Sequence, residues 1–355
     1  MTPVSPAPVD LVVDWDLAVR AAAALSRPGP QVSNEEAAGS VAELRSASIR
    51  AVPHVAEVTG MTAPPADPAL VVDRPGWARV NVAGFRTVLE PVVAESFRRR
   101  EQAPTGAALA FGSRITGAEL GSLLGILSTR VLGQYDAFGE GQRLMLVAPN
   151  VVHVERELEV EPSDFRLWVC LHEETHRVQF GASPWLAEHL LGQIRGLIGG
   201  LMIEPGQLAD RFATALRGLP DLLRGTGSGA PLLDAVQTPQ EREQLARITA
   251  AMSLLEGHAD VVMDAVGPEV VATSTTIRER FTRRRAGRGA VDRVLRRLLG
   301  LEAKARQYAD GARFVRGVQE RVGTDGFNAV WTSPEALPRP TEIADPAAWV
   351  ARVHG

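Results

Sequence analysis

The stretch LHEETHRVQF, residues 171–180, decides the fold because it places two histidines four positions apart on a predicted helix. An α-helix turns by about 100° per residue, so side chains four positions apart share one face and lie one turn apart. His172 and His176 can therefore bind one metal ion. Glu173 lies beside the first histidine, where it can take a proton from a metal-bound water without binding the metal itself. The pattern predicts a bound zinc ion, Zn²⁺, with Glu173 as the catalytic base.

The surroundings of this motif favour a metal site over a chance match. Ser163, after Pro162, can cap a helix that continues to Phe180, before Gly181 and Pro184 intervene. The residues that flank the motif are strongly apolar, so its histidines and glutamates are expected to be partly buried. Buried polar groups are costly without a partner. A bound ion would be that partner.

A catalytic zinc ion needs a third protein ligand and an open position for water. A pattern with a third histidine is excluded, because Gln179 and Ala182 stand where the required glycine and histidine would be. The thermolysin-like spacing, which is also that of aminopeptidases, is excluded as well. It falls on Arg195 and Gly196, neither of which can bind zinc. The third ligand is therefore expected to be a carboxylate at another spacing.

The strongest candidate for the third ligand is Glu256, where a polar cluster interrupts the apolar part of a second long helix. Asp260 lies one turn further on the same face and can accept a hydrogen bond from the distal nitrogen of a ligating histidine. A solvated polar stripe at these two positions is the alternative. Tyr308 is a candidate stabiliser of the oxyanion in hydrolysis, although a structural hydrogen bond is the favoured interpretation of this tyrosine.

The chain as a whole is predicted to be mainly α-helical. Helical spacing of apolar residues covers residues 10–25, 34–58, 77–98, 116–132, 184–202, 207–223 and 238–266. The last of these helices begins at Thr238-Pro239-Gln240-Glu241, which combines an N-cap threonine with a glutamate three positions later. Two β-branched runs, residues 144–148 and 151–160, flank Pro149-Asn150 and predict a small β element directly before the motif helix.

Proline-rich segments suggest how the chain is divided. Residues 61–75 predict an irregular connection and the best internal boundary, and residues 225–229 predict a flexible loop. We therefore expect an N-terminal helical region, residues 1–75, packed on a main body, residues 76–355. The C-terminal tail is expected to be largely irregular and to wrap over this body, with Trp331 and Trp349 as anchors.

The composition excludes several classes of protein. The hydrophobic share is 45% and the formal net charge is -4, so we expect neither a nucleic-acid nor a membrane partner. Cys170 is the single cysteine, which excludes an intrachain disulfide and favours a reducing compartment. The first residues lack basic side chains and a long apolar run, so no secretory signal is expected. The protein is predicted to be cytoplasmic, without a transmembrane helix.

An arginine-rich stretch, residues 278–297, is the one feature that suggests nucleic-acid binding. It lacks interleaved aromatic residues, apart from Phe281, and has no recognisable docking motif. A solvated loop, or an anion-facing rim of the cleft, is the favoured interpretation.

Several motifs together make the chain resemble a known family. They are VLGQYD at residues 131–136, LHEETHRVQF at 171–180 followed by Pro184-Trp185-Leu186, EGHAD at 256–260, and residues 304–308. The chain resembles a family of zincin-like metallopeptidases that are found mainly in actinobacteria. These proteins are labelled as associated with deazaflavin-cofactor biosynthesis, and the function of the family is uncharacterised. This resemblance implies a mainly α zincin-like fold with His172, His176 and Glu256 as zinc ligands and Glu173 as base. It names no substrate.

Two functions from different classes remain open at this point. The first is a zinc-dependent metallopeptidase of the gluzincin type, which hydrolyses a peptide or protein substrate with a zinc-bound water activated by Glu173. The alternative is a non-catalytic, zinc-stabilised helical binding or scaffold protein, in which the fourth coordination position is closed. The oligomeric state is not predicted by the sequence.

Overall fold

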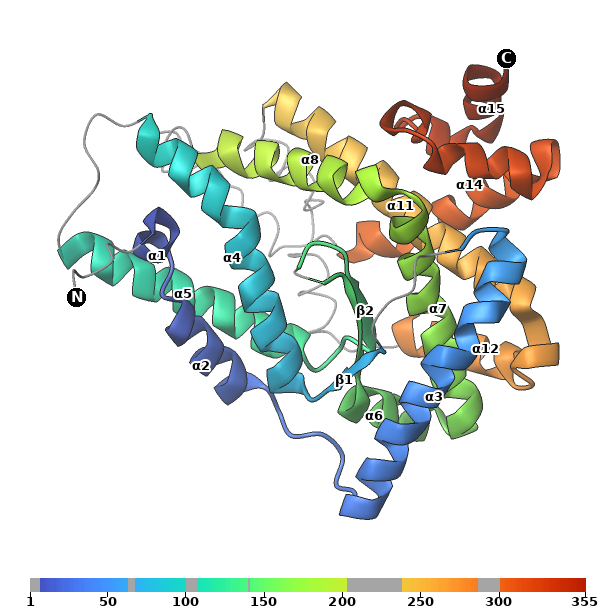
Figure 1. The fold of residues 1–355 in the computed structure, drawn as a ribbon, viewed down its shortest axis with the longest axis horizontal. Coiled ribbons are helices and arrows are strands. Elements are labelled where there is room, and N and C mark those ends of the chain that lie inside the picture. The colour runs from blue at the N-terminus through green and yellow to red at the C-terminus, as the bar shows by residue number, and fades with distance from the viewer. Residues whose placement is uncertain (1–6, 63–67, 100–106, 140, 203–237, 287–300) are drawn as a thin grey trace, which may run out of the picture. The chain divides into compact units, whose positions relative to one another are not determined.

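The computed structural model describes residues 7–62, 68–99, 107–139, 141–202, 238–286 and 301–355, as Figure 1 shows. For residues 107–110, 201–202, 285–286 and 301–309 the description covers the backbone alone. The chain forms two compact units, residues 1–182 with 265–281 and residues 183–264 with 282–355. The division expected after residue 75 stays a prediction. The mainly helical fold class with a small β element is confirmed.

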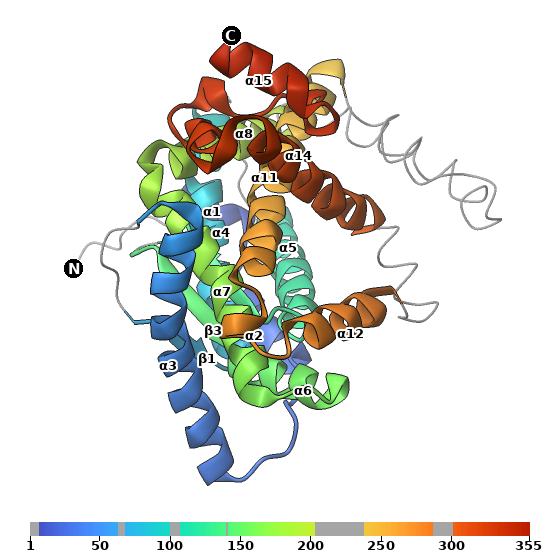
Figure 2. The same ribbon diagram turned by 90° about the vertical axis from the view of Figure 1, so that its right-hand side faces the viewer.

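The first unit is a set of helices packed around a small sheet. Its helices are α1 Pro8–Val12, α2 Trp15–Leu25, α3 Asn34–Thr59, α4 Arg74–Arg98, α5 Ala107–Leu127, α6 Ala148–Leu158 and α7 Pro162–Ala182. Side chains cap several of them: Asp14 accepts from the Leu17 amide at α2, and Asp73 accepts from the Gly76 amide at α4. The long α3 runs beside α7 in both views (Figure 1, Figure 2).

The sheet has three strands, β1 Leu70–Val72, β2 Gly133–Asp136 and β3 Arg143–Val147, in the order β1-β3-β2. β3 is central, parallel to β1 and antiparallel to β2. Its Met145 and Val147 join Trp77 of α4 and Leu124 of α5 in one buried apolar cluster. Burial of this cluster fixes the sheet against the helices, because apolar area removed from water is the main stabilising term in folding.

The β prediction is partly wrong. The run at residues 144–148 is confirmed as β3, but residues 151–160 form most of α6 and not a second strand. Pro149 lies in the first turn of this helix, where its missing N–H costs nothing. Val151, Val154 and Leu158 are all buried, at the spacing of a helix face. The partners of β3 are instead β1, within the segment expected to be irregular, and β2.

The second unit contains the other long helices. They are α8 Pro184–Met202, α11 Pro239–Val270, whose last turns belong to the first unit, and α14 Leu301–Phe327. The predicted start of α11 is confirmed by reciprocal bonds: the Glu241 amide donates to Thr238 Oγ1 at 3.2 Å, and the Thr238 amide donates to Glu241 Oε2 at 2.7 Å. The helix predicted at residues 207–223 and the loop at 225–229 lie outside the described residues.

Helices α11 and α14 cross at two glycines. A methyl group at Gly257 would lie 2.2 Å from the carbonyl carbon of Gly311, and one at Gly311 would lie 1.9 Å from the carbonyl oxygen of Ser253. Such distances are far below van der Waals contact, so the two backbones meet at a point where no side chain fits. Glu256 is the residue next to this crossing.

The C-terminal tail is more regular than expected. It contains the short 3₁₀ helices η1 Asn328–Trp331, η2 Pro334–Ala336 and η3 Glu342–Ala344, and it ends in α15 Pro346–His354. Asp345 caps α15 by accepting from the Ala348 amide, and Pro346 occupies its first turn. Trp331 and Trp349 are buried, as the anchoring role required, and the Trp349 indole donates to the Ala336 carbonyl at 2.8 Å.

The described part of the arginine-rich stretch is helical, so the loop expected there is wrong. It lies in α12 Ser274–Ala286, which begins where Asp164 Oδ2 accepts bonds from the amide and hydroxyl of Thr273. Arg280 donates to the carbonyl oxygens of Leu158 and Glu159 at the C-terminus of α6, where a positive charge is favourable. Among the described helices, none is long and apolar enough to cross a membrane.

Candidate metal centre

Helix α7 carries the histidine motif and is buried on nearly every side. Every residue from Phe165 to Leu171 is buried, and so are Glu173, Glu174 and Thr175. α3 and the sheet pack against it. A helix that is apolar over so much of its circumference forms only inside a core, so its few polar side chains must find partners there.

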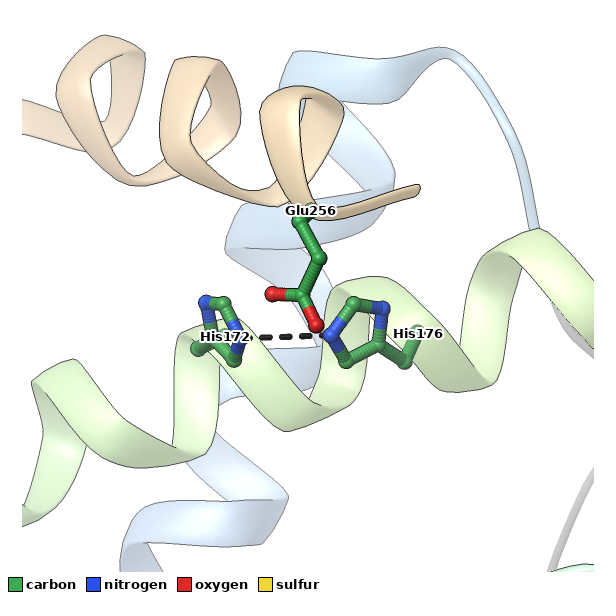
Figure 3. Close-up of side chains that lie close together, drawn as sticks. All are labelled: His172, His176 and Glu256. Atoms are coloured by element: carbon green, nitrogen blue, oxygen red, sulfur yellow. Dashed lines mark hydrogen bonds between the residues drawn. The ribbon is translucent and has the colours of Figure 1, made fainter. Parts of the chain in front are cut away.

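The two histidines of the motif face one another. His172 Nε2 lies 3.2 Å from His176 Nε2, with the two rings nearly perpendicular (Figure 3). Two nitrogens bound to one tetrahedral zinc ion at 2.0–2.1 Å lie about 3.3 Å apart. The spacing of the pair thus fits a shared zinc ion, as the i, i+4 relation predicts.

Gln179 orients one of these rings. His176 Nδ1 lies 2.9 Å from Gln179 Oε1, and the Gln179 side chain has no exposed surface. An amide oxygen can only accept, so a proton on Nδ1 would complete this bond and leave Nε2 as the nitrogen that could bind a metal. This role was not predicted from the sequence, where Gln179 stood only as the residue that breaks a longer motif. Its position three residues past His176, on the same helical face, was the available signal.

Glu256 joins the two histidines. One ligand atom from each of His172, His176 and Glu256 lies within 4.8 Å of the others, and all three side chains are half-buried. Figure 3 shows the Glu256 carboxylate reaching from α11 toward the facing rings of α7. Two imidazoles and one carboxylate are a typical donor set for zinc that leaves a position open. The three residues therefore fit a zinc ion.

The structure describes the other candidate residues, Asp260, His258 and Tyr308, to different extents. Asp260 is half-buried, one turn further along α11, and its hydrogen bond to a ligating histidine stays a prediction. His258 is buried and its ring lies 5.2 Å from that of Phe327 and 5.3 Å from that of Trp331, so it belongs to an aromatic cluster. The side chain of Tyr308 lies outside the described residues.

Glu173, the predicted base, is 6% exposed and lies against β2. On the same flank, Arg177 donates through Nε and Nη2 to both oxygens of the buried Glu174, at 2.7 and 2.5 Å. Burial raises the pKa of Glu174, and the bond to Glu174 raises the pKa of Arg177. The ring of Tyr135 packs 5.7 Å from that of Phe180.

The protein is mainly helical, with a half-buried centre of two histidines and one carboxylate and a glutamate next to the first histidine. The sequence model of the family described as zincin-like metallopeptidase matches residues 13–350. The chain therefore belongs to the zincin-like metallopeptidase family. The association of that family label with deazaflavin cofactors stays an expectation from resemblance.

A solved structure extends the likeness over the whole chain. It is described as a "putative hydrolase with a novel fold" from Chloroflexus aurantiacus, with 30% sequence identity and a TM-score of 0.67. The alignment covers 96% of this chain and 99% of that one. Among curated proteins, none matches the chain. The two matches agree on the fold and on a hydrolase class.

Proposed function

We propose that this protein is a zinc-dependent peptidase of the gluzincin type, with His172, His176 and Glu256 as zinc ligands and Glu173 as the general base. The observation that carries the proposal is the convergence of one ligand atom from each of the three residues within 4.8 Å. Membership of the zincin-like metallopeptidase family supports a peptide or protein as the substrate.

The proposed chemistry divides between the ion and the chain. Zinc at this centre would lower the pKa of a coordinated water to about 7 and polarise a carbonyl oxygen. A carboxylate oxygen of Glu173 takes a proton from the water that attacks the peptide carbonyl carbon, and delivers it to the departing amine nitrogen. A C–O bond forms, the C–N bond breaks, and the amine gains the proton. Burial of Glu173 shields this proton from bulk water.

The test of this function is the variant Glu173→Gln, which keeps the shape of the side chain but cannot accept the proton. We expect it to retain one zinc per chain and to lose peptide cleavage by about 10²–10⁴-fold. The matched control is Glu188→Gln, which removes an exposed glutamate of α8 and should cleave as the wild type does. Activity of Glu173→Gln equal to that of wild type would reject the assignment.

Metal analysis separates the two functions left open by the sequence. Glu256→Ala should lower the zinc content of the purified protein, because one of three protein ligands is lost. Wild-type protein that binds zinc but cleaves nothing in a broad peptide library would favour the non-catalytic scaffold instead. A protein that binds no zinc at all would overturn both.

A further inference from the structure

Strand β2 approaches the predicted base through a residue without a side chain. A methyl group at Gly133 would lie 2.5 Å from Cγ, 2.7 Å from Cδ and 2.8 Å from Oε1 of Glu173. All three distances are shorter than ordinary van der Waals contact, which begins near 3.4 Å. The backbone of the strand therefore lies directly against the carboxyl group of Glu173.

The backbone conformation does not explain the glycine. Among the described glycines, those with positive φ are Gly60, Gly141, Gly267 and Gly323. Gly133 is not one of them and pairs as an ordinary strand residue with Leu146 of β3. What glycine provides at this position is space, so the neighbour that fills the space is the reason for it.

Strand β2 is held in its position against Glu173. Its neighbour β3 is held by the bond from the Val147 amide to the Leu132 carbonyl, 2.8 Å, and both Leu146 and Val147 are fully buried. Gln134, the next residue of β2, bonds to α4: its Oε1 accepts a bond from the Trp77 indole at 2.7 Å and one from Asn81 at 3.2 Å. These bonds fix the strand to α4.

Helix α7 is also held in its position. Arg166, four residues into α7, donates to both carboxylate oxygens of Glu155 on α6, to Glu43 of α3, and to the Ser40 hydroxyl. With the strand and the helix both held, an added methyl group at Gly133 would be accommodated by the Glu173 side chain itself. Its carboxylate would turn away from the position it now has against Gly133.

We propose that Gly133 is a positioning residue for the Glu173 carboxylate: by lacking a side chain, it lets the β2 backbone confine that carboxylate to one position against the strand. The inference rests on the proposed function for its catalytic consequence, but the contact itself can be tested without any substrate. In a working enzyme, displacement of a catalytic group by about 1 Å costs about 10²-fold in rate.

The test is a double-mutant cycle on the 355-residue, zinc-saturated chain. Gly133→Ala is made in wild type, in Glu173→Ala and in Glu173→Gln, and the denaturant midpoint, zinc content and peptide kinetics are measured. Glu173→Ala removes the three atoms that the methyl group meets, so the midpoint shift caused by Gly133→Ala should fall by more than half in that background. Glu173→Gln keeps those atoms, so there the shift should be as large as in wild type.

The kinetic expectation is a loss in kcat of about 10²-fold for Gly133→Ala with KM and zinc content unchanged. In Glu173→Gln the same substitution should cost no further activity, since the base is already absent. The control Gly84→Ala, on α4 where a methyl group meets nothing within 4 Å, should leave kcat unchanged and raise the midpoint slightly, because alanine favours a helix over glycine.

Two results would overturn the inference: an equal midpoint shift in the Glu173→Ala background, or unchanged kcat for Gly133→Ala in an active enzyme. If Gly133→Ala does not fold, recovery of folding in Gly133→Ala/Glu173→Ala supports the contact, and failure to recover rejects it. A wild-type protein without peptide cleavage would reject the proposed function, and the midpoint cycle would then decide the positioning role alone.

Discussion

Helix α7 holds two polar clusters, one buried and one half-buried, that differ in how their donors and acceptors are arranged. At Arg166, every interaction joins opposite charges or a donor to an acceptor: Glu155 accepts at 3.0 and 2.6 Å, and Glu43 and Ser40 complete the set. One and a half turns later, His172 and His176 direct two ring nitrogens at each other. The other nitrogen of the His176 ring, Nδ1, lies 2.9 Å from Gln179 Oε1.

The contrast between the two clusters distinguishes polar groups that stabilise the fold from polar groups that indicate a binding site. A cluster completed by the protein itself stabilises one arrangement of α3, α6 and α7. At the second cluster, Glu256 has a carboxylate oxygen within 4.8 Å of one ring nitrogen from each histidine, and its negative charge would favour a cation there. The two clusters therefore differ in burial as well as in the arrangement of their donors and acceptors.

The largest expected effect is on stability and comes from the first cluster. Arg166→Met leaves the buried Glu155 and its neighbour Glu43 without their cation, so the free energy of unfolding should fall by about 3–5 kcal/mol. Denaturant unfolding measures it. Arg156→Met is the matched control, because Arg156 and Glu36 form an exposed pair, worth about 0–1 kcal/mol. Equal losses in the two variants would contradict the contrast.

The second cluster should respond in zinc affinity. His172→Ala removes one of three proposed ligands, so zinc affinity should fall at least about 100-fold, several kcal/mol being carried by each ligand. The free energy of unfolding of the metal-free chain should change by less than about 1 kcal/mol, because the ring is half-buried. A competition titration with a chelator measures affinity. His153→Ala, on the exposed side of α6, should leave it unchanged.

A smaller effect is expected at Gln179. Gln179→Ala removes the acceptor that fixes the His176 tautomer, and zinc affinity should fall about 10- to 100-fold. Gln179→Glu keeps an acceptor at the same distance and should restore most of the affinity. Wild-type affinity in Gln179→Ala would mean that the ring is oriented by its packing alone.

The smallest effect concerns pH and separates two carboxylates that each accept two bonds from an arginine. Burial raises the pKa of Glu155 more than the bonds from Arg166 lower it. Burial also acts to raise the pKa of Glu342, but the bonds from Arg352 and the Arg339 amide outweigh it and lower this pKa.

The two pKa shifts predict that stability depends on pH with opposite signs for the two carboxylates. The stability that Glu155 contributes relative to Glu155→Gln should be complete below its unfolded pKa, about 4.3, and decline as the pH rises through its folded pKa. For Glu342 against Glu342→Gln it should be complete above about 4.3 and be lost as the pH falls through the folded pKa. Unfolding free energies across this range test both, and parallel slopes would contradict the assignment.

Local signals in the sequence predicted much of the fold. The helices predicted near residues 34–58, 77–98, 116–132, 184–202 and 238–266 are confirmed. The reciprocal bonds of Thr238 and Glu241 confirm the start of α11. The wrong strand at residues 151–160 shows where composition misleads: β-branched residues favour strands only weakly, and burial of Val151, Val154 and Leu158 on one face prevailed.

The centre was predictable only in part, for a physical reason. The relation of His172 to His176 is set by helix geometry alone, so the sequence contains it. The contact of Gly133 with Glu173 depends on β2 pairing with β3, in a strand of four residues that begins with glycine and has little β propensity. The role of Gln179 lay within reach, since helix spacing alone places it beside His176.

The crossing of α11 and α14 limits how this chain can change over generations. Gly257 and Gly311 each exclude a methyl group, so no single substitution at either position is tolerated without moving a helix, and Glu256 moves with α11. A lineage that keeps the carboxylate must keep both glycines, although neither can bind zinc. Transplanting the centre into another scaffold would likewise require α14 to be carried along with the two helices that hold the ligands.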